Sequence, residues 1–370
     1  MRIAFLADAL DLQSAGVHVY TREIIKALAN IETKHEYIIV RVNRSAEPTT
    51  FEELPIPYIK IPGYKAYRLF WQLPRLLAKR KVDVVVEPAH FGPFNLPQHI
   101  KRVTFIHDLT PLLFPQYHVY HSQLLQRLFL PSILRRAAHV ITNSAHTRQD
   151  LIQFFPFTAN KSTATLLGKD RIYRPVEDAK VLEAYGIQPP YWLCVGTIEP
   201  RKNIKVLLAA FDRLKAETNG PHQLVLLGKK GWKSEDIYQR IQDSPFREAI
   251  HLPGYVEREA LPVIYSMAEV FIYPSFYEGF GLPVLEAMSC GVPVLTADVS
   301  SLPEVGGEGA LYFDPHSVEE LVDWLRKLSQ SPALRQQQGR LGLKRAAQFS
   351  WEKTARETDA IFDQLAAKKS

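Results

Sequence analysis

Residues 270–294 read Val-Phe-Ile-Tyr-Pro-Ser-Phe-Tyr-Glu-Gly-Phe-Gly-Leu-Pro-Val-Leu-Glu-Ala-Met-Ser-Cys-Gly-Val-Pro-Val, and this stretch decides the fold. Residues 270–274 are β-branched or aromatic and uncharged, which predicts a buried strand. Gly279 and Gly281 let the backbone turn sharply and let a ligand approach closely. Pro283 suits the first turn of a helix, where its missing N–H costs nothing. The pattern predicts a strand, a glycine turn, and a helix whose first N–H groups can bind a phosphate.

Two glutamates belong to the same stretch. Glu278 lies on the predicted loop, and Glu286 lies about one turn into the predicted helix. A carboxylate close to a phosphate is repelled unless it has another partner. A pair of sugar hydroxyls is an obvious partner, so the stretch is suited to a ligand that carries both phosphate and sugar.

The sequence Glu-Gly-Phe-Gly-Leu-Pro-x-Leu-Glu-Ala-Met at 278–288 resembles the signature of family 4 of the retaining nucleotide-sugar glycosyltransferases, the group 1 glycosyltransferases. The resemblance implies the α/β GT-B fold, in which two Rossmann-like parallel-sheet domains face each other across a cleft. It also implies that Glu286 holds the ribose hydroxyls. The donor sugar would contact Glu278 and the backbone of Gly279, Phe280 and Gly281, and the diphosphate would meet the helix start at Leu282, Pro283 and Val284. A generic strand–turn–helix corner is the alternative.

Length and composition are those of a globular protein with two domains. The chain has 370 residues, of which 46% are hydrophobic and 23% charged. Cys194 and Cys290 are too far apart in sequence for a disulfide framework or a metal motif. The first residues do not have the pattern of a signal peptide, so we expect a cytoplasmic protein. The net charge of +6 favours anionic partners such as a nucleotide diphosphate or an acidic membrane surface, and no nucleic-acid-binding pattern is present.

Short apolar strands alternate with helices along the whole chain, which predicts parallel sheets covered on both faces. Ligands of such sheets bind beyond the carboxyl ends of the strands, here in the loops 8–16, 87–94 and 107–111 of the first half. The predicted strands are Arg2–Ala7, Tyr37–Arg41, Val82–Glu87, Arg102–His107, Ala138–Asn143, Thr163–Leu167, Tyr191–Gly196, Gln223–Gly228, Ile250–Tyr255, Val270–Pro274, Val292–Thr296 and Ala310–Phe313.

We expect a first, acceptor-side domain over residues 1–173 and a nucleotide-sugar domain over residues 174–349. Residues 170–175 form the predicted crossing between them. The resemblance implies that residues 350–370 form a helix that returns toward the first domain.

Three positions of the first half are candidates for the site. His107 leaves a buried strand at its carboxyl end, and relatives carry a histidine here that meets the donor sugar. His90 leaves the neighbouring strand and is a second candidate. In relatives, a glycine-rich loop at this place faces both the donor phosphate and the acceptor. In this sequence Gly16 is the one glycine of that loop.

A basic loop follows the first strand of the second half. Gly196-Thr-Ile-Glu-Pro-Arg-Lys-Asn203 resembles the phosphate-clamp loop of the family, with Lys202 at the position of its lysine. Many relatives carry an arginine at the position of Thr197, and Arg201 can supply that charge. Adjacent cations at a strand-to-helix turn stabilise a diphosphate whose charge grows as the sugar bond breaks. The alternative is a solvated Arg-Lys pair on a surface turn.

The functional hypothesis is a retaining hexosyltransferase without a cofactor. We expect it to be independent of metal, since no Asp-x-Asp motif offers metal ligands. The Gly196–Asn203 loop is similar to the mannosyltransferase-like branch of the family, which implies GDP-mannose as donor and a glycan or lipid-linked acceptor in polysaccharide or glycoconjugate synthesis. Tyr255 and Val256 are candidates for the nucleobase contact. The alternatives are a nucleotide-sugar epimerase and a non-catalytic sugar-nucleotide-binding subunit.

Residues 65–81 mix aromatic and aliphatic side chains with lysines and arginines. A basic amphipathic helix of this kind can lie on the inner face of an anionic membrane. The alternative is a crossover helix that packs on the sheet with its basic ends in water, and Pro74, which interrupts the helical run, favours this alternative.

Overall fold

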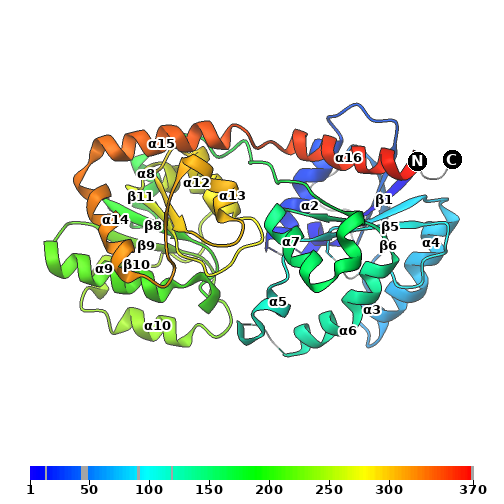
Figure 1. Cartoon of the computed structure of the whole chain (residues 1–370), viewed down its shortest axis with the longest axis horizontal. Helices are drawn as coiled ribbons and strands as arrows, with labels where there is room; N and C mark the ends of the chain where they lie inside the picture. Colours follow the sequence, from blue (N-terminus) through cyan, green and yellow to red (C-terminus); the bar gives the residue numbers. More distant parts are fainter. Residues whose placement is uncertain (13–14, 43–48, 90–91, 118–119, 368–370) are drawn as a thin grey trace. The chain divides into compact units, whose positions relative to one another are not determined.

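The computed structural model describes residues 1–12, 15–42, 49–89, 92–117 and 120–367, which form two units (Figure 1). Unit 1 comprises Met1–Gly168 and Ser350–Ser370, and unit 2 comprises Lys169–Phe349. Each unit is built around one parallel β-sheet flanked by helices. The predicted fold class, two α/β domains with parallel sheets, is confirmed.

The sheet of unit 1 has seven parallel strands in the order β3-β2-β1-β4-β5-β6-β7. The prediction missed β3, because its sequence Glu-Glu-Leu-Pro is short, carries two charges and ends in proline, as suits an edge strand. The bounds are β1 Arg2–Leu6, β2 Glu36–Arg41, β3 Glu52–Pro55, β4 Val84–Glu87, β5 Lys101–Ile106, β6 Ala137–Thr142 and β7 Ser162–Ala164.

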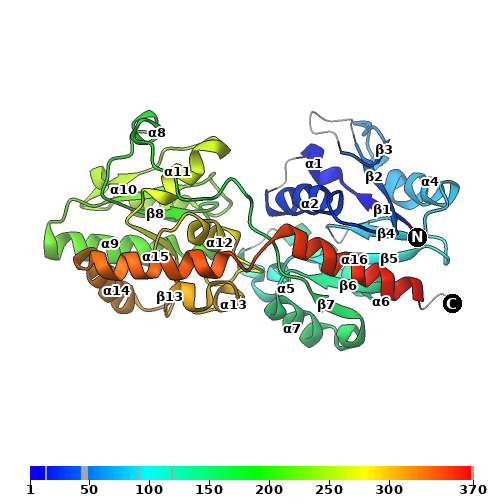
Figure 2. The same cartoon turned by 90° about the horizontal axis from the view of Figure 1, so that it is seen from above.

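Helices cover both faces of this sheet. Alternate residues of a strand point to opposite faces, so Ile38 and Val40 pack against α4, whereas Tyr37 faces α16. Helices α2 and α16 lie side by side (Figure 2). The helical segments are α1 Asp8–Leu12, α2 Ala15–Leu28, α3 Tyr64–Tyr67, the π-helix η1 Arg68–Gln72, α4 Leu73–Lys79, α5 Thr110–Leu113, η2 Pro115–Tyr117, α6 Tyr120–Arg136, α7 Ala145–Phe154, η3 Pro156–Lys161 and α16 Trp351–Ala367.

The prediction of a loop at residues 8–16 is wrong. The described part of this segment forms α1 and the first turn of α2, and Gly16 lies inside α2. Helix α1 is held by its acidic side chains. The Asp11 carboxylate accepts a hydrogen bond from the Arg41 guanidinium at 2.8 Å and from the Val42 backbone N–H at 3.0 Å.

The sheet of unit 2 has six parallel strands in the order β10-β9-β8-β11-β12-β13, so all six predicted strands are present. Strand β10 is much shorter than predicted, since Pro253 lacks the N–H that a further ladder bond would need. The bounds are β8 Tyr191–Val195, β9 Gln223–Leu227, β10 Ile250–His251, β11 Val270–Tyr273, β12 Val294–Ala297 and β13 Ala310–Phe313.

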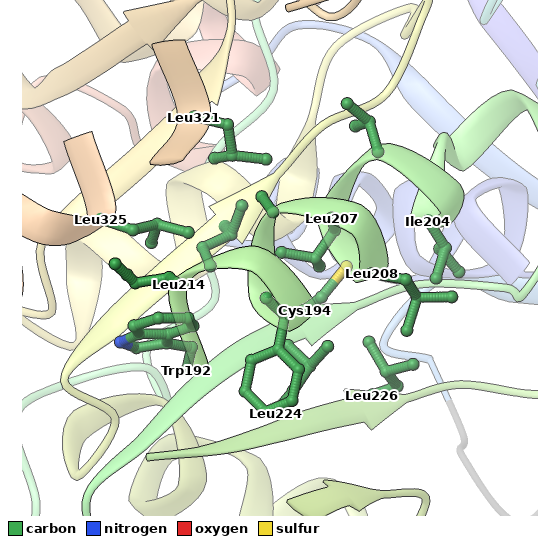
Figure 3. Close-up of a cluster of buried hydrophobic side chains, with 14 of the residues drawn as sticks. Trp192, Cys194, Ile204, Leu207, Leu208, Leu214, Leu224, Leu226, Leu321 and Leu325 are labelled. Atoms are coloured by element: carbon green, nitrogen blue, oxygen red, sulfur yellow. The ribbon is translucent and has the colours of Figure 1, made fainter. Parts of the chain in front are cut away.

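The core of unit 2 is a cluster of leucine and isoleucine side chains with Trp192 and Cys194 of β8 among them (Figure 3). Helices α9, α10 and α14 pack on this face of the sheet, and α11, α12 and α15 pack on the other. The helical segments are α8 Ala179–Ala184, η4 Pro200–Lys202, α9 Ile204–Thr218, α10 Glu235–Gln242, η5 Arg247–Ala249, η6 Arg258–Ala260, α11 Leu261–Ser266, α12 Leu282–Ser289, α13 Leu302–Gly306, η7 Gly307–Gly309, α14 Val318–Gln330 and α15 Pro332–Ala346.

The strand order of each sheet reverses once. In unit 1 the chain runs outward from β1 through β2 and β3, then continues on the other side of β1 with β4. In unit 2 the same reversal separates β8 from β11. Ligands of open parallel sheets bind beyond the carboxyl ends of the strands at such reversals. The loops that follow β8 and β11 are therefore the first place to look for a site.

Unit 1 is assembled from two separate stretches of the chain. The chain leaves unit 1 at Gly168 and re-enters it at Ser350, where α16 begins with Trp351. A Cβ atom at Gly168 would overlap the backbone nitrogen of Trp351, so only glycine fits here. Further along α16, the Asp359 carboxylate accepts hydrogen bonds from the Tyr37 hydroxyl at 2.6 Å and the Thr33 hydroxyl at 2.7 Å.

The substitution Gly168→Ala should destabilise unit 1 by roughly 1–3 kcal/mol, because the added methyl group overlaps backbone that cannot yield easily. Urea unfolding, combined with hydrogen exchange of the α16 amides, measures the effect. The matched control is Gly16→Ala, since no atom lies within 4 Å of the added Cβ. This helical position should gain roughly 0.5–1 kcal/mol. An unchanged exchange rate in α16 of Gly168→Ala would contradict the close contact.

Candidate functional site

The loops that follow β8 and β11 meet at the strand reversal of unit 2. The Phe276 backbone N–H donates to the Arg201 carbonyl at 3.0 Å. The Asn203 side-chain amide donates to the carbonyls of Pro274 at 3.1 Å and Pro315 at 2.7 Å. Asn203 has a left-handed backbone (φ 53°), a conformation that asparagine tolerates better than most residues. These bonds fix the position of the Arg201-Lys202 pair, which directly precedes Asn203.

Lys202 points into the protein, between the two loops. Its ammonium group donates to Glu278 Oε1 at 2.7 Å and to the Tyr273 hydroxyl at 2.6 Å, and only 8% of the residue is exposed. Burial lowers the pKa of Lys202, and the negative charge of Glu278 opposes this shift. A lysine ammonium has three N–H donors. The two named contacts use two of them, so the third can serve a ligand.

Glu278 forms ion pairs with two cations at one carboxylate oxygen. Arg201 Nη1 lies 2.9 Å from Glu278 Oε1, the same atom that Lys202 contacts. Burial alone would raise the pKa of Glu278, but the charges of Arg201 and Lys202 outweigh it and lower this pKa to about 2. Glu278 is therefore a carboxylate at neutral pH.

Arg201 completes the cluster from the same loop as Lys202. Its guanidinium donates to the Tyr277 carbonyl at 2.7 Å and to Glu199 Oε1 at 2.7 Å. Neither Arg201 nor Lys202 is an exposed surface side chain, so the alternative of a solvated Arg-Lys pair is wrong. Two cations and two carboxylates thus form one compact network, the 201–278 cluster, made of Glu199, Arg201, Lys202 and Glu278.

The glycine turn between β11 and α12 has the predicted shape. Gly281 caps α12 with a left-handed backbone (φ 101°), and a Cβ atom there would lie 2.8 Å from Leu302 Cδ2. Glycine is required at this position for both reasons. The Ser301 hydroxyl donates to the carbonyls of Glu278 at 2.8 Å and Phe280 at 2.9 Å, which holds the turn from the α13 side. Helix α12 then begins at Leu282 with Pro283 in its first turn.

Glu286 lies on α12 with a different set of neighbours. The Tyr265 hydroxyl donates to Glu286 Oε2 at 3.0 Å. Burial raises the pKa of Glu286 to about 7, while hydrogen bonds from Tyr265 and Tyr173 act in the opposite direction. The two predicted glutamates therefore differ in charge state, although both lie at the same strand–turn–helix corner.

Gly196 ends β8 with an extended, positive-φ backbone (φ 152°). A Cβ atom there would lie 3.4 Å from Lys202 Cε, so glycine leaves room for the lysine side chain. Tyr255 and Val256 follow the edge strand β10 instead, two strands away from β8 in the sheet. Tyr255 is 67% exposed, and its hydroxyl donates to Glu257 at 3.4 Å. The described contacts do not join Tyr255 or Val256 to the 201–278 cluster.

Of the candidates of unit 1, His107 follows β5 at its carboxyl end. His107 Nε2 lies 2.8 Å from the Pro88 carbonyl, which can only accept, so Nε2 carries the proton. Burial lowers the pKa of His107, and this ring is neutral near pH 7. Gly16 is exposed in the first turn of α2, where its backbone does not require glycine. His90 lies outside the described residues.

Sequence reasoning missed Tyr273 as a site residue, and it did not show which contact Ser300 makes. Tyr273 contacts Lys202 with its hydroxyl, and its ring centroid lies 4.8 Å from the lysine nitrogen. Ser300 accepts a hydrogen bond from the Glu278 backbone N–H at 2.9 Å. Tyr273 is the last residue of an uncharged strand, and ligands bind beyond the carboxyl ends of such strands. This position is the signal by which the sequence could have identified Tyr273. The partners of Tyr273 and Ser300 are distant in sequence, so no local pattern shows the contacts.

Among the described residues, one group of three side chains has metal-ligand geometry, namely His35, Asp359 and Asp363 of unit 1. His35 precedes β2 and so lies at the amino end of that strand, opposite the edge where ligands bind. Asp363 also contacts the Lys34 ammonium at 3.0 Å, and Asp359 accepts two hydroxyl hydrogen bonds. These carboxylates already have protein partners.

Comparison with known proteins finds family matches to both halves of the chain. The family profile described as glycosyl transferases group 1 matches residues 181–345, and the profile described as glycosyltransferase family 4 matches residues 14–165. The O-antigen chain mannosyltransferase B of Escherichia coli is 33% identical over 97% of this chain and 98% of its own length.

Solved structures share the fold over the full length. Sucrose-phosphate synthase from Thermosynechococcus elongatus superposes with a TM-score of 0.78 at 22% identity and covers 100% of both chains. Anabaena Alr3699/HepE, solved in complex with UDP-glucose, superposes with a TM-score of 0.76 at 17% identity, over 99% of this chain and 100% of its own.

The low pKa of Glu278 predicts a pH-dependent stability. A carboxyl with a pKa of about 2 in the folded state and 4.5 otherwise stabilises the fold by about 3 kcal/mol above pH 4.5. That contribution is lost as the pH falls from about 4.5 toward about 2. The stability difference between wild type and Glu278→Gln should therefore shrink between pH 7 and pH 3, as measured by urea unfolding. A difference that stays constant over this range would contradict the ion-pair assignment.

Proposed function

Because this chain belongs to the group 1 glycosyltransferases of glycosyltransferase family 4, we propose that it is a retaining hexosyltransferase that uses GDP-mannose. The acceptor in this proposal is a glycan or a lipid-linked glycan, in polysaccharide or glycoconjugate synthesis. The observation that carries the proposal is the 201–278 cluster at the strand reversal of unit 2. The relative of this chain from Escherichia coli is named an O-antigen chain mannosyltransferase, and this name supports mannose as the sugar.

In the proposed reaction the bond between the anomeric carbon and the diphosphate oxygen breaks. A bond from the acceptor oxygen to that carbon forms on the same face, and the acceptor proton ends on the released diphosphate. Negative charge therefore grows on the diphosphate in the transition state. The third N–H of Lys202 and the Leu282 N–H at the start of α12 stabilise that charge, since they are fixed before the reaction begins. Pro283 has no N–H, and the Val284 N–H donates to the Gly281 carbonyl at 3.0 Å. We propose that no metal is needed, because these cationic and dipolar groups meet the charge.

The two glutamates have separate tasks in this proposal. Glu278 keeps Lys202 charged and in place, and its second carboxylate oxygen faces the donor sugar beside the Gly279–Gly281 backbone. Glu286, to which the Tyr265 hydroxyl donates, takes the ribose hydroxyls. Burial holds His107 neutral, although its bond to the Pro88 carbonyl acts in the opposite direction, and His107 stays a proposed contact of the donor sugar. Tyr255 and Val256 stay proposed contacts of the nucleobase.

Lys202→Ala should lower turnover by ~10²–10³-fold, the scale for loss of one transition-state donor. Arg201→Ala should lower turnover less, since Arg201 supports Glu278 and the loop more than it faces the ligand. The matched control is Lys205→Ala, whose exposed side chain pairs with Asp236 at the surface and should leave turnover unchanged. Release of GDP from GDP-mannose in the presence of an acceptor extract measures all three. Wild-type turnover in Lys202→Ala would contradict the clamp.

The donor is tested by thermal shift with GDP-, UDP-, ADP- and TDP-sugars. A ligand present at about 100 times its dissociation constant adds roughly 2.7 kcal/mol to stability, so the true donor should raise the melting temperature distinctly. We expect GDP-mannose to give the largest shift, and Glu286→Ala to reduce it through loss of the ribose contact. A shift with a UDP-sugar and none with GDP-mannose would reject the donor while leaving the clamp in place.

A further inference from the structure

One segment of unit 1 carries a concentrated positive charge. Between Glu53 and Asp83 the chain has seven lysines and arginines and no acidic residue. Two of these cations are used within the fold. The Arg68 guanidinium binds the Asp8 carboxylate at 2.5 and 2.7 Å, and Arg80 pairs with Glu52 at 3.0 Å. The remaining five are Lys60, Lys65, Arg75, Lys79 and Lys81, all of them exposed and without an ion pair to any residue that the structure describes.

The same segment exposes an unusual amount of apolar surface. Of the eleven large hydrophobic side chains that are exposed in the described part of the chain, five lie within residues 58–71. Isolated exposed side chains need no explanation, but a cluster of this kind marks an interaction site. The five are Tyr58 (45% exposed), Ile59 (50%), Ile61 (58%), Tyr67 (48%) and Trp71 (47%).

The helical part of the segment has one buried face and one exposed face. Leu73 and Leu77 are buried in the core of unit 1. Tyr67, Trp71, Arg75 and Lys79 recur every fourth residue through α3, η1 and α4, and all four are exposed. The rings of Tyr67 and Trp71 stack with centroids 6.4 Å apart. The segment therefore packs on the sheet, as the crossover-helix alternative predicted, and still presents an outer face of aromatic and cationic side chains.

We propose that this face, the 58–79 surface, docks unit 1 on an anionic lipid bilayer. Tyr and Trp side chains favour the interface between headgroups and acyl chains, and Ile59 and Ile61 add aliphatic side chains that can enter the apolar layer. The unpaired lysines and arginines face the lipid phosphates. A stacked Tyr-Trp pair can also bind sugar rings, but sugar binding does not explain two exposed isoleucines and the four unpaired cations within residues 58–79. No helix in the described ranges is long and apolar enough to cross a membrane.

The surface is directly connected to the edge of unit 1 where ligands bind. Arg68 of η1 holds Asp8, which follows β1 at the strand reversal of unit 1. A π-helix such as η1 often occurs at functional sites. Docking through the 58–79 surface would therefore bring the β1 edge close to the headgroup layer. This inference deepens, and rests on, the proposed lipid-linked acceptor, but its test needs neither donor nor turnover.

The test is flotation of the full chain with vesicles of phosphatidylcholine mixed with phosphatidylglycerol and with vesicles of phosphatidylcholine alone. We expect the wild type to float with the anionic vesicles, to stay behind with the neutral ones, and to be released by added salt. Equal behaviour with both kinds of vesicle would overturn the proposal. Because no sugar nucleotide is present, this failure is independent of the donor and clamp experiments.

Variants locate the contact. Each cation near an anionic surface contributes about fivefold in binding constant, so Arg75→Gln/Lys79→Gln should weaken vesicle binding about 25-fold. The matched control is Lys353→Gln/Arg356→Gln, two exposed cations on α16 of the same unit, which should bind as the wild type does. A control as weak as the Arg75/Lys79 variant would show a general charge effect and overturn the assigned surface.

The aromatic pair distinguishes lipid from glycan. Tyr67→Ala/Trp71→Ala should lose vesicle binding, whereas Trp232→Ala, an exposed tryptophan of unit 2, should retain it. If the Tyr67/Trp71 variant still binds anionic vesicles but no longer binds mannotetraose in a calorimetric titration, the surface is a glycan subsite and the membrane proposal is wrong. Circular dichroism checks that each variant is folded.

Discussion

One buried carboxylate oxygen holds the functional corner of unit 2 together. Glu278 Oε1, from the loop after β11, forms ion pairs with both cations of the loop after β8. Loss of one partner from a buried ion pair leaves an uncompensated charge, at a cost of about 3–5 kcal/mol. The two loops are therefore bound to each other by electrostatics as well as by backbone hydrogen bonds. The lysine that can meet a phosphate is oriented before any ligand arrives.

The two glutamates at this corner differ in pKa because their surroundings differ. Glu278 faces two cations, which hold its pKa at about 2. Glu286 of α12 accepts hydrogen bonds from Tyr265 of α11 and from Tyr173, and burial raises its pKa to about 7. A permanent carboxylate is suited to fixing a cation, while a carboxyl near its titration point exchanges partners easily. The same residue type thus serves as a structural anion in one place and as an adaptable hydrogen-bonding group in the other.

The sequence predicted the parts of the fold that depend on local patterns. Buried strands such as β8 and β11 are uncharged and rich in aromatic and aliphatic residues. The turn at Gly281 is indicated by two glycines next to a proline that suits a first helical turn. Contacts between distant residues were beyond local patterns, and the pairing of Lys202 with Tyr273 and Glu278 is the main example. Strand β3 and helix α1 were missed because each is short and carries two acidic residues. The fold holds them through ion pairs and hydrogen bonds, such as that of Arg41 with Asp11.

The discontinuous make-up of unit 1 has a consequence for the nascent chain. All of unit 2 lies between the two stretches of unit 1, so the ribosome completes unit 2 before α16 exists. Until then Tyr37 and Thr33 lack Asp359, and Gly168 lacks the backbone of Trp351 against which it packs. Domains fold as units during synthesis, generally in the order in which they emerge. In this chain the order is reversed, and the half that is translated first completes its core last.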